Sequence, residues 1–228
     1  IDTKTTRTKM SGGTGVLPEG LLKPSTVYRA GIAFLIIGSL IGSYFVITNG
    51  ILIAIILGFA ILSIYFYSTK IVDSGLGEFF VAVKGSMIVI GTFFIQSGEV
   101  TVESILAGIV IGTLSSLVLF IASFPDHDAD KSKGRKTLVI VVGKEKAVKL
   151  FWLFPLVSYV IILIGVSVNL FPFLSLISLL SFPLMIKSGL GLQKNYDAID
   201  NLVPFMSSTL QFSRLTGILF ALSFLIPF

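Results

Sequence analysis

Seven apolar runs, each close to the length of a membrane-crossing helix, dominate this chain of 228 residues. The hydrocarbon core of a bilayer is about 30 Å thick, and roughly 20 mainly apolar residues of α-helix cross it. Lipid offers no hydrogen bonds to the backbone, so each run is expected to be helical. The sequence therefore predicts an all-α, multi-pass transmembrane helical bundle. The seven predicted spans are 25–48, 51–67, 78–97, 103–124, 146–168, 170–187 and 205–227.

Composition and charge support this class and set an orientation. Hydrophobic residues make up 54% of the chain and charged residues only 13%. Fifteen of the seventeen Lys and Arg lie in alternate polar segments and the adjoining helix ends, and the intervening turns carry none. By the positive-inside rule these segments face the cytoplasm of a cell-membrane protein, so the basic excess predicts orientation and no nucleic-acid partner. The basic segments are 1–24, 68–77, 125–145 and 188–204.

The acidic motif Asp126-His-Asp-Ala-Asp130 directly follows the fourth apolar run, and four cations follow it within residues 131–136. In a helix, Asp126 and Asp130 share one face with roughly 5–6 Å between their Cβ atoms, and Asp128 points largely elsewhere. Two such carboxylates suit a Mg²⁺ ion that keeps several waters and binds phosphate oxygens. Pro125 suits a helix break or a first turn. The alternative is a solvated loop whose charges pair among themselves.

Four further positions carry polar chemistry at or inside the predicted spans. Tyr67 and Lys70, at the end of the second run, suit contact with a phosphate or an acceptor, or an interfacial tyrosine and a snorkelling lysine. Lys84 and Arg214 lie inside predicted spans, where a cation faces a polar cavity, pairs with an acid or snorkels to the interface. His127 is the only histidine. It is either a general base or a bystander.

The stretch Pro125-Asp126-x-Asp128-x-Asp130-Lys131-x-x-Gly134-Arg135-Lys136-Thr137-Leu138, followed by Gly143, resembles the second aspartate-rich motif of the UbiA superfamily of intramembrane prenyltransferases. The resemblance covers most of the chain. Ser11-Gly-Gly-Thr-Gly-Val-Leu17 and Gly75-Leu-Gly-Glu78, with Tyr67 and Lys70, are similar to the 1,4-dihydroxy-2-naphthoate prenyltransferase branch.

Two departures from the family pattern bear on what the resemblance implies. Family members have nine transmembrane helices and a first motif N-D-x-x-D-x-x-x-D, of which only Asp2 matches the last aspartate. Residues 1–228 are thus expected to form a single UbiA-like domain that lacks its two N-terminal helices. Tyr67-x-x-Lys70 is one residue shorter than the family's Y-x-x-x-K.

The resemblance implies transfer of a prenyl group from a prenyl diphosphate to an aromatic or other lipophilic acceptor, with a quinone or menaquinone precursor favoured. Mg²⁺ would help the pyrophosphate to leave, and a carbocation-like carbon would then be captured away from water. The implied metal ligands are Asp2, Asp126 and Asp130. The implied catalytic residues are Tyr67, Lys70, Asp126, Asp128 and Asp130, with Asp128 or His127 orienting the acceptor or taking its proton. The implied substrate-binding residues are Asp2, Arg7, Lys9, Lys84, Lys131 and Arg135.

A membrane transporter is the main alternative from another class. It would use Lys84 and Arg214 as charges along a pathway. Neither an internal repeat of broken helices nor a spread of charge along the spans supports it. A CDP-alcohol phosphotransferase would need D-x-x-D-G-x-x-A-R before G-x-x-x-D-x-x-x-D, and this pattern is not found.

Overall fold

The computed structural model describes residues 13–226, with the side chains of Ser68 and Thr69 left aside. This part of the chain is helical and contains no strand, which confirms the predicted all-α class. Short helical turns also occur at Tyr67–Ile71, Val72–Ser74 and Phe173–Ser181. The α-helices are α1 (Pro24–Asn49), α2 (Ile51–Phe66), α3 (Gly77–Ser97), α4 (Val102–Ser132), α5 (Leu138–Val142), α6 (Lys144–Leu150), α7 (Leu153–Ser167), α8 (Phe182–Asn195) and α9 (Ile199–Ser223).

Each predicted apolar run coincides with helical structure, but the number of clear spans is smaller than predicted. Within the described residues, five helical segments are long and apolar enough to cross a membrane. Helix α2 has only 16 residues. Helix α9 is long enough, but Gln211 and Arg214 lower its apolar character. The five segments are Pro24–Asn49, Gly77–Ser97, Val102–Ser132, Lys144–Ser167 and Phe173–Asn195.

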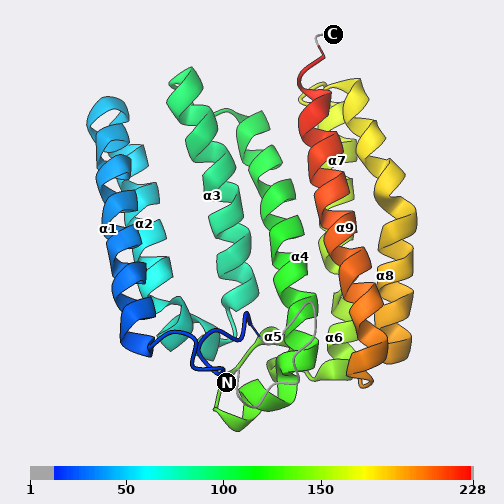
Figure 1. The fold of residues 1–228 in the computed structure, drawn as a ribbon. Helices are drawn as coiled ribbons and strands as arrows, with labels where there is room; N and C mark the ends of the chain where they lie inside the picture. The colour runs from blue at the N-terminus through cyan, green and yellow to red at the C-terminus, as the bar shows by residue number, and fades with distance from the viewer. Residues whose placement is uncertain (1–12, 227–228) are drawn as a thin grey trace.

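The helices run up and down, so the connections alternate between the two ends of the bundle (Figure 1). Helices α1 and α2 form a hairpin on one side, α3 and α4 lie next to them, and α7, α8 and α9 form the other side. Gly50, with φ +83°, provides the left-handed backbone for the turn between α1 and α2. The polar segments before α1, after α2, after α4 and after α8 all lie at one end, as the charge pattern predicts.

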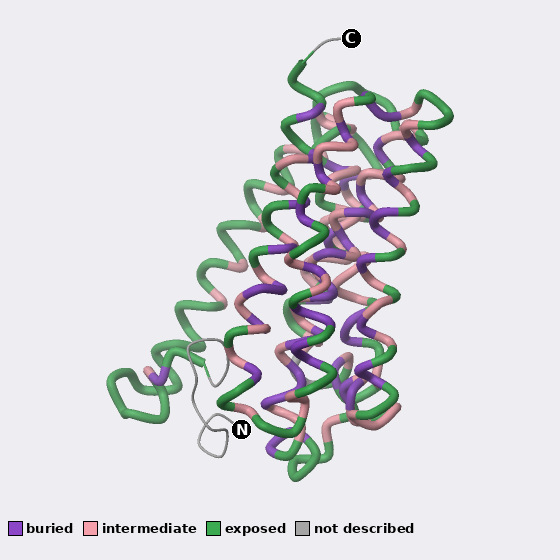
Figure 2. The backbone as a smooth tube through the Cα atoms, turned by 90° about the vertical axis from the view of Figure 1, so that its right-hand side faces the viewer, coloured by how far each residue is buried: buried purple, intermediate pink, exposed green. Residues whose placement is uncertain are grey.

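The core lies among α4, α7, α8 and α9 rather than in the middle of the whole bundle. Its largest fully buried side chains include Phe120 and Phe124 of α4 and Phe212 of α9. Helix α1 has no buried residue, and Figure 2 shows mostly exposed residues along one side of the molecule and most of the buried residues toward the other. Apolar side chains that remain exposed on such helices suit contact with lipid tails.

Helices α3 and α4 approach each other closely because glycines line their contact. A Cβ atom at Gly112 would overlap the carbonyl oxygen of Ala82 and lie 2.6 Å from Ser86 Oγ. A Cβ atom at Gly85 would lie 2.7 Å from the Cα of Gly112, and one at Gly108 would lie 2.9 Å from the Ser86 carbonyl oxygen. Small residues at this spacing let membrane helices pack backbone to backbone. The contact fixes α3 against α4.

Candidate functional site

Asp126 and Asp130 of the acidic motif lie on the last turns of α4. The helix continues through Pro125 to Ser132, so the helix break or first turn predicted at Pro125 is wrong. Because the motif is helical, Asp126 and Asp130 share one face. Both line a cavity of about 120 Å³ at the end of the bundle, where Asp130 is only 4% exposed.

Arg135 folds back onto the end of α4 and pairs with Asp130. Its Nη1 lies 3.3 Å from Asp130 Oδ1, and its backbone N–H donates to the Asp130 carbonyl oxygen at 3.1 Å. Gly134 has φ +78°, a conformation that glycine adopts without strain and that this tight reversal needs. Arg135 itself lines the cavity. One guanidinium is therefore held at the cavity with only part of its hydrogen-bonding capacity used by Asp130.

Glu78, in the first turn of α3, lines the same cavity. The residue is 4% exposed, and its carboxylate lies close to its own backbone and that of Leu138 without a well-aligned hydrogen bond to either. Glu78 was expected only as part of the motif Gly75–Glu78 and not as a residue of the site. The sequence signal that could have identified Glu78 is an acidic residue at the start of an apolar run, because such residues line polar cavities.

Gly75 allows the motif Gly75–Glu78 to pack against the aspartate-rich motif. Its φ of +79° allows the turn into α3, and a Cβ atom there would lie 3.2 Å from both the Lys136 carbonyl oxygen and Val141 Cγ2. The segment before Glu78 therefore packs directly against the segment after Arg135. A side chain at Gly75 would push the two segments apart.

Tyr67 completes the cavity from the π-helical turn after α2. Its hydroxyl would lie 3.6 Å from a Cβ atom at Gly77, which places the phenol against the start of α3. Burial raises the pKa of Tyr67, the nearby Glu78 carboxylate raises it further, and Arg135 acts in the opposite direction. The phenol therefore stays protonated and able to donate a hydrogen bond at neutral pH.

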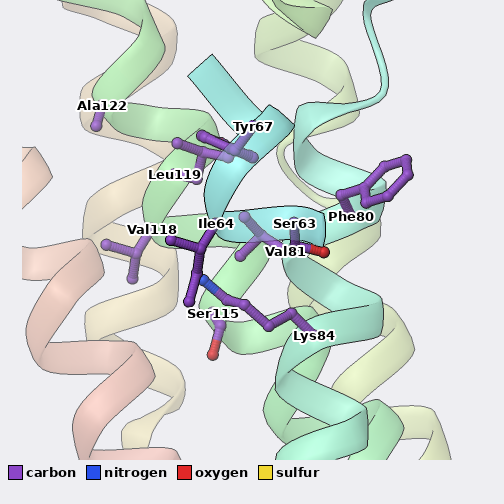
Figure 3. Close-up of a pocket in the computed structure, with 10 residues that line it drawn as sticks. All are labelled: Ser63, Ile64, Tyr67, Phe80, Val81, Lys84, Ser115, Val118, Leu119 and Ala122. Atoms are coloured by element: carbon purple, nitrogen blue, oxygen red, sulfur yellow. The ribbon is translucent and has the colours of Figure 1, made fainter. Parts of the chain in front are cut away.

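A larger groove of about 580 Å³ adjoins this small cavity between α2, α3 and α4 (Figure 3). Tyr67, Leu119 and Ala122 line both spaces. The groove is otherwise mainly apolar, with Lys84 and a few hydroxyls among its lining. A charged compartment therefore opens into an apolar one. The remaining lining residues are Ser63, Ile64, Phe80, Val81, Lys84, Ser115 and Val118.

The other predicted site residues lie apart from the two cavities. The Asp128 side chain is 84% exposed and lies 2.7 Å from His127 Nδ1. Lys131 is exposed, as is Arg214 of α9. Lys70 is also exposed, with Nζ 5.4 Å from the centroid of the Phe66 ring. Asp2, Arg7 and Lys9 fall outside the described residues.

The donor set at the small cavity suits one partly hydrated divalent cation. Within residues 13–226, no group of three or more His, Cys, Asp or Glu side chains is placed to hold a metal ion by itself. Asp126 and Asp130 nevertheless present two carboxylates from one helix face to the cavity. Mg²⁺ is commonly bound by one or two carboxylates, waters and substrate phosphates. The residues present therefore fit such an ion together with a phosphate ester.

Fold and site together define a multi-pass membrane protein with an acidic and basic cavity over an apolar groove. Residues 1–225 match the UbiA prenyltransferase family, and the chain belongs to this family. It is 29% identical over 219 residues to the 1,4-dihydroxy-2-naphthoate octaprenyltransferase of Bacillus subtilis (strain 168), covering 94% of this chain and 70% of that protein. It is also 29% identical over 152 residues to the protein of the same name from Escherichia coli (strain K12), covering 65% of this chain and 48% of that protein. No solved structure gives a significant match.

These matches show that the chain is a membrane prenyltransferase, as the sequence motifs predict. They support prenyl transfer to a quinone-type acceptor and a place in menaquinone-type biosynthesis. A prenyl diphosphate donor and a lipophilic acceptor are the substrates that such an enzyme implies. The transporter alternative is therefore set aside.

Proposed function

We propose that the protein transfers a prenyl group from a prenyl diphosphate to an aromatic quinone precursor, with the naphthoate named for its relatives as the favoured acceptor. The diphosphate would occupy the small cavity, and the active site would face the cytoplasm. The observation that supports this most strongly is the convergence of Asp126, Asp130 and Arg135 on a cavity that opens into an apolar groove. A prenyl diphosphate has the same two parts, a charged head and an apolar tail.

Asp126 and Asp130 would hold Mg²⁺, with Asp2 as the predicted third ligand. The bound ion would neutralise charge that develops on the departing diphosphate. Arg135 would hold diphosphate oxygens through its guanidinium N–H groups, which suit phosphate geometry. Tyr67, at the junction of the two spaces, would donate a hydrogen bond from its phenol hydroxyl to the diphosphate.

In the proposed reaction, the allylic C–O bond breaks and its electron pair leaves with the diphosphate. An electron-rich carbon of the acceptor then forms the new C–C bond. The apolar groove keeps water away from the cation, which water would otherwise capture. Asp128 and His127 stay the predicted candidates for orienting the acceptor or taking its proton. The Asp128 side chain is exposed, whereas His127 is only 13% exposed and contacts Asp128.

The test is prenyl transfer by the purified full chain carrying Asp126→Ala or Asp130→Ala. Labelled prenyl diphosphate and 1,4-dihydroxy-2-naphthoate are the substrates, and prenylated product and pyrophosphate are measured. Each variant should lose roughly 100-fold or more of its turnover, and excess EDTA should abolish the wild-type reaction. Asp200→Ala, in the first turn of α9, is the matched control with normal turnover. Undiminished turnover of folded Asp130→Ala, or full activity in EDTA, would refute the proposed metal role.

A further inference from the structure

Lys84 is the only charged residue among the ten described residues that line the larger groove. Figure 3 shows its side chain extending from α3 across the groove, with the nitrogen beside Ser115 and Ile64. It lies six residues beyond Glu78 on a helix that rises 1.5 Å per residue, so it is about 9 Å deeper along α3 than the small cavity. Lys84 therefore lies well along a helix that can span the membrane, and the residue is exposed rather than buried.

No carboxylate of the described chain forms an ion pair with Lys84. Intramembrane cations are costly, and they pair with an acid, snorkel to the interface, or mark the path or site of a ligand. The groove has a second polar group without a partner: the Ser63 hydroxyl is buried, 7% exposed, and makes no hydrogen bond within the described residues. Two separate side chains from α2 and α3 thus lack a polar partner in the same apolar space.

A prenyl chain does not explain these two groups, because a hydrocarbon neither accepts a hydrogen bond nor carries a counter-charge. The diphosphate head does not explain them either, since Arg135 and the aspartates lie in the other cavity. An unneutralised ammonium would moreover destabilise an allylic cation formed nearby, because like charges repel strongly where the dielectric constant is low. An acceptor with an anionic oxygen would satisfy Lys84 and remove this repulsion.

We propose that Lys84 binds the anionic oxygen of the acceptor, so that the groove selects aromatic acceptors that carry a carboxylate or phenolate. Ser63 donates a hydrogen bond to the same acceptor. The acceptor ring shares the groove with the start of the prenyl tail and lies against the apolar side chains of Ile64, Phe80 and Val118. The inference rests on the proposed function, and it assigns to Lys84 a role in acceptor specificity rather than in diphosphate binding.

The experiment compares wild-type protein with Lys84→Met and Lys84→Arg while each substrate is varied separately. Loss of a charge-assisted hydrogen bond should raise the acceptor KM of Lys84→Met roughly 10- to 100-fold, with the prenyl diphosphate KM within about twofold of wild type. Lys84→Arg should recover part of the loss. The matched control is Lys187→Met, an exposed lysine on α8, and it should leave both KM values unchanged.

A second measurement separates this inference from the proposed function. Thermal unfolding is followed with 1,4-dihydroxy-2-naphthoate or its neutral carboxamide, without prenyl diphosphate. The naphthoate should stabilise wild-type protein more than the carboxamide does, and Lys84→Met should lose the difference. Equal stabilisation of wild type by the two compounds, or an unchanged acceptor KM in Lys84→Met, overturns the role of Lys84 even if prenyl transfer proceeds. Absence of prenyl transfer with a preserved naphthoate shift contradicts the proposed function alone.

Discussion

Gly112→Ala tests whether the close contact between α3 and α4 holds the site together. Helix α3 carries Glu78 and Lys84, and α4 carries Asp126 and Asp130. The new Cβ atom would overlap the carbonyl oxygen of Ala82, a backbone atom that has no rotamer by which to move away. The two helices must therefore separate locally, or the backbone near Ala82 must bend.

The sign of the effect depends on two opposed contributions. Replacing glycine by alanine inside a helix favours folding by up to about 1 kcal/mol. Overpacking a well-packed contact costs about 1–3 kcal/mol, and the upper part of that range applies because the clash is with backbone. The net loss of stability should be about 1–2 kcal/mol. For a chain of this size that corresponds to a fall in Tm of roughly 2–8 °C.

Thermal unfolding in detergent measures this directly, with Gly38→Ala as the matched control. Gly38 also lies inside an apolar helix, α1, but nothing lies within 4 Å of a Cβ atom placed there. That control should melt at or slightly above the wild-type temperature. The Gly112→Ala variant should also lose prenyl transfer, because α3 and α4 carry opposite walls of the site. A Tm for Gly112→Ala equal to or above wild type would contradict the backbone contact.

Two further predictions concern the small cavity. Burial and Glu78 raise the pKa of Tyr67. The folded state therefore holds the phenol proton more tightly than the unfolded state does. The stability that this contributes is lost as pH rises above the ordinary tyrosine pKa of about 10. Melting from pH 8 to 11 should therefore show a steeper decline for wild type than for Tyr67→Phe, and parallel curves would contradict the burial of the phenol. Arg135→Met leaves the Asp130 carboxylate without its 3.3 Å partner. It should destabilise the protein by about 1–3 kcal/mol in denaturant unfolding, whereas an unchanged midpoint would show that the pair contributes nothing.

The placement of Asp126 and Asp130 on one face could be predicted because it requires only helical geometry. Spacing of four residues gives that result wherever the helix continues. The helix break or first turn predicted at Pro125 was wrong because the missing N–H group of proline is tolerated where neighbouring helices support the backbone. Pro125 is itself buried in α4. The tertiary surroundings of a proline, which sequence alone does not provide, decide whether it ends a membrane helix.

The position of Glu78 in the lining of the small cavity was not predicted, because it depends on a contact between segments that are distant in the sequence. The turn at Gly75 brings Glu78 against residues that follow Arg135, and no periodicity in the sequence encodes that approach. The same limit applies to the 3₁₀ helix Phe173–Ser181, whose serines repeat every third residue. Ser175 bonds to Ser223 at 2.8 Å, and Ser181 bonds to Thr216 at 2.7 Å. The apolar run predicted a span there, but the hydroxyl contacts with α9 that favour the tighter helix become evident only in three dimensions.

The charged residues that line the small cavity are mainly acidic, and the one that lines the larger groove is basic. The donor and the acceptor therefore meet different charges. Three acidic side chains, Glu78, Asp126 and Asp130, and one guanidinium line the small cavity, so the metal ion of the proposed mechanism would reduce the repulsion that a diphosphate meets from these acids. The larger groove presents Lys84 without an acidic neighbour in its lining, so an anionic acceptor enters by attraction. On the proposed assignment, a divalent cation is therefore needed to admit the donor and not the acceptor. Tyr67, which lines both spaces, then lies where the broken C–O bond and the new C–C bond must meet.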